Sequence, residues 1–502
     1  MLTGVDYFVV IAYIIGMLLL GLYFKRFVDS SEDYFLGGRS LPFWAIGMSI
    51  VVSDIGALDF VGVSGQAYRY GVSVGNFDWV GSVPAMLLAA FIFIPYFWRG
   101  GMYTIPEYLG KRYNLSVRTI ASLTWILFFA LDLGVLFWSS AVLLNVLLGW
   151  TIWSSILITA GVVGLYTYFG GITAVIMTDV VQMVIMFVGG AALVYLSLDA
   201  VGGWDNLVDK VYNMGPEYRE HFHIIQPSDT KSPFPWTGIL FGLTFVMSNA
   251  YMIGNQSIVQ RCLTAKNEWH AKASMILASA LKMAIPVLVL FPGLMAIVVH
   301  PGLADGDQAL PMMIKTILPP GLVGLMFAAF FAGLMSSVDS LLNSTATLFT
   351  KDIYEPFIKK DGDDDHYLKV GKLTTLVLLL IGVATAPISS GFPGIYVAIQ
   401  TFMSFFQGPL FAILLLGIFW KKSTPLGGLS ALVIGIGSAI LMHIFKGQFF
   451  HIEDPFLFIS WWSFLVGFVV NVVVSLMTRP HTKEHLKGLV YDPKILSTSK
   501  EI

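Results

Sequence analysis

Long apolar stretches recur along the whole chain, and they constrain its fold more than any other feature. About 18 or more largely apolar residues suffice to cross a bilayer as a helix. Because backbone groups in lipid must satisfy their own hydrogen bonds, repeated spans predict an all-α polytopic membrane protein. We expect thirteen spans, at about 5–24, 43–66, 76–98, 118–147, 151–169, 173–198, 236–259, 272–299, 319–349, 370–390, 395–419, 425–445 and 456–478.

Composition excludes several classes of protein. Hydrophobic residues make up 56% of the chain and charged residues only 12%, which rules out a soluble multidomain protein. A net charge of −2 argues against a nucleic-acid partner. The single cysteine, Cys262, cannot form an internal disulfide. We find no nucleotide-binding motif and no cluster of His or Cys ligands, so we expect no enzyme, and active transport would need an ion gradient.

The basic residues predict how the chain is oriented in the membrane. Residues 1–6 contain no Lys or Arg, whereas Lys25 and Arg26 follow the first span. This pattern is typical of a retained helix rather than a signal peptide, and it predicts an N-terminus outside a cell membrane. Most other basic residues then fall in cytoplasmic loops, among them Arg261, and 479–502 becomes a cytoplasmic tail.

A short helix is expected at the inner surface after the third span. The stretch Tyr103–Tyr113 has Pro106 near its start and Lys111 and Arg112 near its end. Proline suits the first turn of a helix, and basic side chains favour the membrane surface.

Polar residues interrupt two of the spans at matching positions. The stretch Ser53–Gly62 places Asp54 and Asp59 at membrane depth, where carboxylates in a continuous helix would cost several kcal/mol each. A helix broken near Ser53–Gly56 would free backbone groups for an ion or solute. Five spans later, Ser248–Gln256 repeats the interruption. An offset of five spans reverses the second copy, so the pattern predicts an inverted repeat.

Charged residues inside the spans are the first candidates for function. Six acids against one base suit cation binding, and Lys282 needs an acidic partner, for which we expect Asp59 or Asp78. A lysine among carboxylates and amides suits a polyhydroxylated solute, although a structural ion pair is the alternative. Asp132 fits a structural acid equally well. The full set is Asp54, Asp59, Asp78, Asp132, Asp179, Lys282 and Asp339.

A serine pair in the ninth span is a weaker candidate. The hydroxyls of Ser336 and Ser337 and the carbonyl of Gly333 are hard oxygen donors of the kind that sodium prefers. Small residues in a membrane helix also favour close helix packing, and the spacing alone does not decide between a sodium site and a packing role.

Several separated motifs together indicate a known family. They include Tyr103-Thr-Ile-Pro-Glu-Tyr, the run from Tyr168 to Asp179, Gln260-Arg261, and Asn343-Ser-Thr-Ala-Thr. With these motifs the chain resembles the sodium:solute symporter family, most closely its sodium/glucose cotransporter branch, over nearly its whole length. The resemblance implies one transporter domain over 1–480. Its parts would be an extra helix at 5–24, five-helix repeats at 43–198 and 236–420, each beginning with a discontinuous helix, and two extra helices at 425–478.

The resemblance also implies a sodium site and a solute site. Sodium would bind carbonyls of Val52, Ile55 and Gly333 and hydroxyls of Ser336 and Ser337, while Asp179 matches an acid linked to sodium binding or release. For the solute, Lys282 and Gln400 match sugar-binding residues, Tyr251 matches an aromatic gate, and Asp78 replaces a family Glu. Asp59 and Ser248 complete the expected solute site but depart from the galactose-type pattern, as do Asp54 and Gly81.

We therefore expect a sodium-coupled symporter that imports a monosaccharide or related polyol by alternating access. Nearest among the alternatives is a sodium symporter for an amine, amino acid, carboxylate or vitamin, and the membrane acids would suit an amine best. A solute-gated sensor or passive channel is the alternative from another class. The sequence leaves the oligomeric state open.

Overall fold

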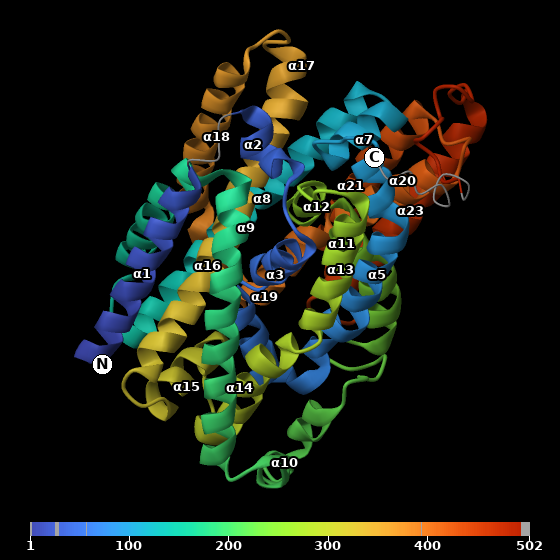
Figure 1. The fold of residues 1–502 in the computed structure, drawn as a ribbon. Coiled ribbons are helices and arrows are strands. Elements are labelled where there is room, and N and C mark those ends of the chain that lie inside the picture. Colours follow the sequence, from blue (N-terminus) through green and yellow to red (C-terminus); the bar gives the residue numbers. More distant parts are fainter. Residues whose placement is uncertain (1–2, 26–29, 57, 393, 493–502) are drawn as a thin grey trace.

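The computed structural model describes residues 3–25, 30–56, 58–392 and 394–492, without the side chains at 22, 25, 31 and 165–171. Helices form almost all of its regular structure (Figure 1). The α-helices are α1 Gly4–Lys25, α2 Ser31–Leu36, α3 Phe43–Asp54, α4 Ser64–Tyr70, α5 Val83–Leu88, α6 Ile94–Arg99, α7 Ile105–Arg112, α8 Leu115–Leu148, α9 Ile152–Val201, α10 Trp204–Tyr212, α11 Ser248–Gly254, α12 Gln256–Leu263, α13 Glu268–Lys282, α14 Ile285–Val299, α15 Ala309–Ile317, α16 Leu322–Leu348, α17 Glu355–Phe357, α18 Asp364–Thr385, α19 Ile395–Ser404, α20 Gln407–Phe419, α21 Pro425–Ile444, α22 Lys446–Phe449 and α23 Phe456–Met477.

Shorter helical segments of other types join the α-helices. Five of them are π-helical, with one more residue per hydrogen-bonded turn than an α-helix: η2 Asp59–Val63, η4 Phe77–Ser82, η5 Ala89–Phe93, η7 Gly238–Met247 and η9 Phe349–Tyr354. The remainder are 3₁₀ turns: η1 Gly37–Arg39, η3 Gly71–Gly75, η6 Pro216–Phe222, η8 Gly306–Gln308 and η10 Ala386–Gly391.

The apolar helices cover the spans expected from the sequence. Within the described residues, nine helices are long and apolar enough to cross a membrane, and α19 with α20 forms a further, bent span. Three shorter apolar helices complete the set, at 43–54, 152–164 and 238–254. Together these segments cover all thirteen expected spans, and the prediction of an all-α membrane protein is confirmed.

Two expected spans, 151–169 and 173–198, fall within the single helical element α9. At 1.5 Å per residue, its 50 residues correspond to about 75 Å, more than twice the hydrocarbon thickness of a bilayer. The element therefore contains enough residues for two crossings. Its apolar content is high on both sides of residues 165–171.

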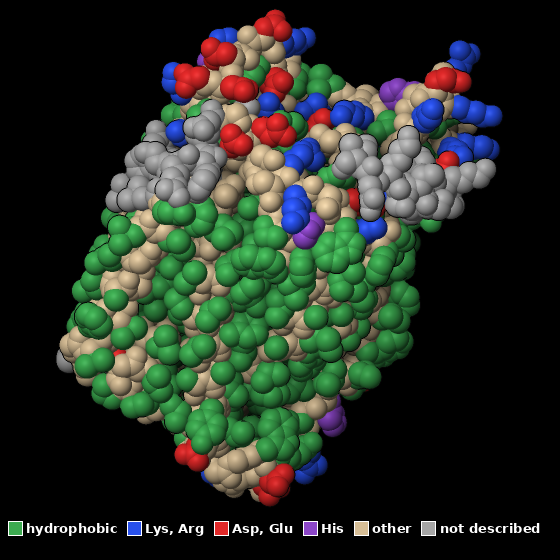
Figure 2. Space-filling view, viewed as in Figure 1, with side chains coloured by type: hydrophobic (Ala, Val, Ile, Leu, Met, Phe, Trp, Pro, Cys, Tyr) green, Lys and Arg blue, Asp and Glu red, His purple; other side chains and the backbone are tan. Residues whose placement is uncertain are grey.

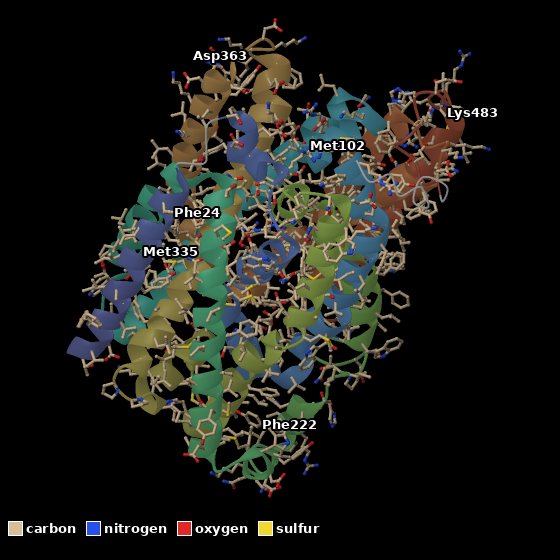
Figure 3. All side chains as sticks on the ribbon, in the orientation of Figure 1. Phe24, Met102, Phe222, Met335, Asp363 and Lys483 are labelled. Carbon is tan, nitrogen blue, oxygen red and sulfur yellow. The ribbon has the colours of Figure 1, made fainter. Side chains whose placement is uncertain are left out.

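The face of the molecule drawn in Figure 2 separates into an apolar belt and two charged ends. Hydrophobic side chains cover the middle of the molecule, while Lys and Arg gather at the end that carries α2 and α7. We call this the basic end and the opposite one the α10 end. Asp363 and Lys483 lie at the basic end and Phe222 at the α10 end (Figure 3). The first described residues lie on the side of the α10 end, and the expected tail at 479–502 is described only to residue 492.

Both expected helix breaks are present. α3 ends at Asp54, and Ile55 leaves the helical region with φ −107° and ψ 83°. α11 ends at Gly254, and Asn255 interrupts the helix with φ −72° and ψ 119° before its side chain caps α12. Each expected repeat thus begins with a discontinuous helix.

The expected surface helix is present as α7, but one of its basic residues has a different role. Thr104 caps its first turn by accepting a hydrogen bond from the Glu107 amide. Arg112 is fully buried instead of facing the membrane surface. Its guanidinium donates to the carbonyls of Gly417, Trp420 and Ser423 at 2.7, 2.9 and 3.0 Å, because the end of α20 leaves these acceptors unpaired.

Candidate functional site

The expected sodium ligands meet where α3 breaks against α16. Two glycines permit this approach: a Cβ on Gly333 would lie 2.9 Å from the Ile55 carbonyl oxygen, and a Cβ on Gly56 would collide with the Ser337 hydroxyl. Ser337 donates to the Ser53 carbonyl at 3.0 Å. Only glycines at these positions let the two backbones come so close.

Serine hydroxyls connect this junction to Asp179 on α9. Asp179 Oδ2 accepts from Ser49 at 2.5 Å and from Ser53 at 3.2 Å, and the Ser53 and Ser336 hydroxyls lie 2.7 Å apart. The other carboxylate oxygen of Asp179 is buried without a hydrogen-bond partner among the described residues. Val52 is fully buried in the last turn of α3. Carbonyl, hydroxyl and carboxylate oxygens with an unused acceptor fit a hard monovalent cation.

Arg261 belongs to this cluster, which corrects its assignment to a cytoplasmic loop. It is completely buried in α12, and its guanidinium lies 3.5 Å from Asp179 Oδ2. It also donates to Ser49 at 2.7 Å, to Ser53 at 2.6 Å and to the Ser340 hydroxyl. The Arg261 guanidinium and the serine hydroxyls therefore compensate the charge of the buried Asp179 carboxylate within the apolar belt.

A single cavity next to this junction is lined by all six expected solute residues. They come from both discontinuous helices and from the spans between them, and the cavity has an empty volume of about 1030 Å³, part of it continuous with solvent. Its lining also includes Ser53, Gly56 and Ser337 of the junction between α3 and α16. The six expected residues are Asp59, Asp78, Ser248, Tyr251, Lys282 and Gln400.

Lys282 is held where α13 gives way to α14. Its ammonium pairs with Asp78 Oδ1 at 2.6 Å and with Asp54 Oδ2. The pairing with Asp78 was expected, whereas Asp54 takes the place that Asp59 was expected to hold. Trp79 donates to the carbonyl of Met283 at 3.0 Å and so satisfies an acceptor that the helix break exposes. The lysine is therefore fixed on one wall of the cavity.

The π-helical segments position several of the cavity residues. Asp59 is the first residue of η2, Asp78 lies in η4, and Ser248 directly follows η7. Asp59 accepts a hydrogen bond from the Gly56 amide at 3.0 Å and so caps the break in the first discontinuous helix. Such π-helical turns inside α-helices are frequent at functional sites.

Of the remaining acids in the spans, some line the cavity and one is buried between the packed helices. Asp132 lines the cavity, together with Asp54. Asp339 is fully buried in α16 and does not line it.

Gly81 leaves room for Ser248, since a Cβ there would lie 2.5 Å from the Ser248 hydroxyl. Gly81 and Ser248 both depart from the galactose-type pattern, and the small residue at 81 gives the Ser248 side chain the space that it occupies.

A charged cluster lies at the start of α19, the helix that carries Gln400. Asp307 in η8 accepts from the Ile395 amide at 2.8 Å and so caps this helix. Its other oxygen lies 3.6 Å from Arg69 Nη1, and Arg69 Nη2 binds Asp305 at 2.8 Å. Burial raises the pKa of Asp307 to about 7, although Arg69 and the Ile395 amide act in the opposite direction. The carboxylate thus joins α4, η8 and α19.

Comparison with known proteins decides the family. The model of the sodium:solute symporter family matches residues 34–435. The chain belongs to this family. The symporter is 32% identical to a sodium/glucose cotransporter of Vibrio parahaemolyticus over 95% of this chain and 91% of that protein. It is 31% identical to sodium/glucose cotransporter 1 of Ovis aries and 30% identical to a sodium/myo-inositol cotransporter of Homo sapiens. These alignments cover 99% and 98% of the symporter and 82% and 76% of the relatives, in that order.

Solved structures share the fold. A sodium-coupled sialic acid symporter in an outward-open state matches with a TM-score of 0.83 at 23% identity, over 96% of this chain and 99% of that one. A nucleobase-cation-symport transporter matches with a TM-score of 0.60 at 14% identity, over 92% and 98% of the two chains. The molecule is a sodium-coupled membrane symporter of a small solute and not an enzyme, with sodium as the coupling ion.

Proposed function

We propose that the symporter imports a monosaccharide or related polyol together with sodium. The observation that carries this proposal is that one cavity is lined by all six expected solute residues and by Ser53, Gly56 and Ser337 of the junction between α3 and α16. Hydroxyl groups of a sugar need both donors and acceptors, and the cavity offers Lys282, Gln400 and several carboxylates. Relatives named as sodium/glucose and sodium/myo-inositol cotransporters support the same substrate class.

Sodium binds, in this proposal, at the junction of α3 and α16. The ligands are the carbonyls of Val52, Ile55 and Gly333 and the hydroxyls of Ser336 and Ser337. Asp179 supplies negative charge through the serine hydroxyls that it binds. The unused oxygen of Asp179 supports its role in attracting the cation.

Coupling follows from the residues that the two sites share. Ser53, Gly56 and Ser337 face the cavity and also form the sodium junction, so an ion that fixes the break in α3 also fixes one wall of the solute site. A linkage of about 1–3 kcal/mol between the two sites is typical and sufficient. In alternating access, the repeats at 43–198 and 236–420 then move against each other and expose both the sodium site and the solute site to the cytoplasm. The N-terminus lies outside the cell in this proposal, and the basic end lies inside.

The test is uptake of labelled sugars by proteoliposomes with and without an inward sodium gradient. We expect accumulation only with the gradient, and we expect Ser337→Ala to abolish it because one hydroxyl ligand is lost. Ser438→Ala is the matched control, since that hydroxyl binds the Gly435 carbonyl in α21 and lies outside the site.

Three results would count against the proposal. Unchanged sodium dependence in Ser337→Ala would refute the ion site. Accumulation of an amino acid, carboxylate or vitamin instead of any sugar would refute the substrate class. Equal flux without a gradient would favour a passive channel.

A further inference from the structure

The cavity contains more carboxyl groups than its own lysine can pair with. Four carboxylates line it, and Lys282 is its single ammonium among the described lining residues. Lys282 already pairs with Asp54 and Asp78. Asp59 is held by the Gly56 amide, but Asp132 makes no hydrogen bond or ion pair within the described part of the chain. A carboxylate within the apolar belt that lacks a partner in the protein is suited to a partner that arrives with the solute.

A second, independent observation points to a ligand at the same place. Gln407, at the start of α20, lines the cavity and is only 1% exposed. Neither its side-chain nitrogen nor its oxygen has a hydrogen-bond partner among the described residues. Burying an amide without partners costs free energy, so a pocket that retains one favours a bound group that can satisfy it.

Asp132 on α8 and Gln407 at the start of α20 both line the cavity. The ring of Phe406, next to Gln407, lies 5.2 Å from that of Trp125 and 5.3 Å from that of Phe128. Asp132 follows Phe128 by four residues, one turn further along the same face of α8. The residue before α20 thus packs against α8 one turn away from Asp132, and both unpaired groups belong to residues that line the same cavity.

A bound metal ion does not explain the unpaired carboxyl and amide groups of the cavity. No group of three or more His, Cys, Asp or Glu side chains within the described residues is arranged to hold a metal. The acids are instead distributed around a cavity large enough for an organic solute. An ammonium group can donate both to the Asp132 carboxylate and to the Gln407 carbonyl oxygen.

We propose that Asp132 and Gln407 bind a cationic amino group of the transported solute, so that the preferred substrate is an amino-substituted sugar or polyol. This inference rests on the proposed function and specifies the substrate class of the same site. The ammonium lies between Asp132 and Gln407, while hydroxyl groups of the solute face Lys282 and the acids that hold it.

The test compares sodium-driven uptake of glucose, glucosamine and N-acetylglucosamine at a pH at which the free amine is protonated. We expect a half-saturation concentration for glucosamine at least about tenfold lower than for glucose, the size of one charged hydrogen bond. Acetylation removes the charge and should remove the advantage. Asp132→Asn and Gln407→Leu should each bring the glucosamine-to-glucose ratio close to one. Asp365→Asn, an exposed acid at the basic end, should preserve the ratio.

Failure of the inference is distinguishable from failure of the proposed function. Sodium-driven glucose uptake without preference for glucosamine, and with the same ratio in Asp132→Asn, overturns the inference and leaves the proposed function intact. If no sugar accumulates, the proposed function fails. Thermal stabilisation of the purified symporter by ethanolamine then decides the inference: stabilisation that Asp132→Asn abolishes supports the cationic subsite, and its absence in the unsubstituted protein refutes it.

Discussion

Replacing Asp307 by asparagine should remove a pH dependence from the stability of the symporter. Burial raises the pKa of Asp307 from its ordinary 3.8 to about 7. Between these values the folded protein retains a proton that the unfolded chain has lost, so stability falls as pH rises and levels off above about pH 7. At 1.36 kcal/mol per pH unit, the loss between about pH 5.5 and 8 amounts to roughly 2 kcal/mol.

Asparagine keeps the acceptor for the Ile395 amide but does not titrate. The Asp307→Asn variant should therefore show a flatter profile than the unsubstituted protein when thermal unfolding in detergent is followed across this pH range. Asp305→Asn is the matched control: it removes the other acid on Arg69 and should retain a pH dependence of the same sign. Parallel profiles for the unsubstituted protein and Asp307→Asn would refute the assignment of this proton to Asp307.

Three further substitutions test the sodium junction, the solute site and the fold. Gly333→Ala forces a Cβ to within 2.9 Å of the Ile55 carbonyl, so we expect weaker sodium activation of transport, and unchanged activation would exclude that carbonyl as a ligand. Lys282→Ala leaves two buried carboxylates without their cation, so solute affinity should fall and stability should drop by about 3–5 kcal/mol; normal uptake would place the lysine outside the site. Arg112→Ala should cost about 3 kcal/mol or more in unfolding measurements, against less than about 1 for the exposed Lys111→Ala, and equal losses would contradict its capping role.

Hydropathy and polar interruptions predicted the architecture because both reflect the bilayer directly. A span must be apolar for its whole length, and a carboxylate at membrane depth needs a protein or aqueous environment. The breaks at Ile55 and Asn255 follow from this requirement. Small residues also predict close packing: Gly56 and Gly333 lie in segments expected to be broken or tightly packed, and their close contacts require the absence of a side chain.

Residues near helix breaks were harder to place. Arg261 follows the second break by six positions, and its charge predicts a loop, because a charge pattern does not indicate that a short helix such as α12 is buried in the protein. The choice of Asp54 over Asp59 as a partner of Lys282 depends on the dihedral angles at Ile55, which sequence spacing does not determine. Gln407 was missed because one amide in an apolar span gives no signal until its lack of partners is visible.

The π-helical segments around the cavity give the chain an additional route to change what it transports. A π-helical turn amounts to one residue inserted into an α-helix. Deleting a single residue from η7 would let this segment return to α-helical geometry. Side chains inside the segment, including Leu243 and Met247 of the cavity lining, would then point in new directions, whereas the helix after it would keep its orientation because the wider turn had absorbed the extra residue. Insertions and deletions of one residue within a span, usually regarded as destructive in membrane helices, are therefore a means of reshaping this cavity while its scaffold stays in place.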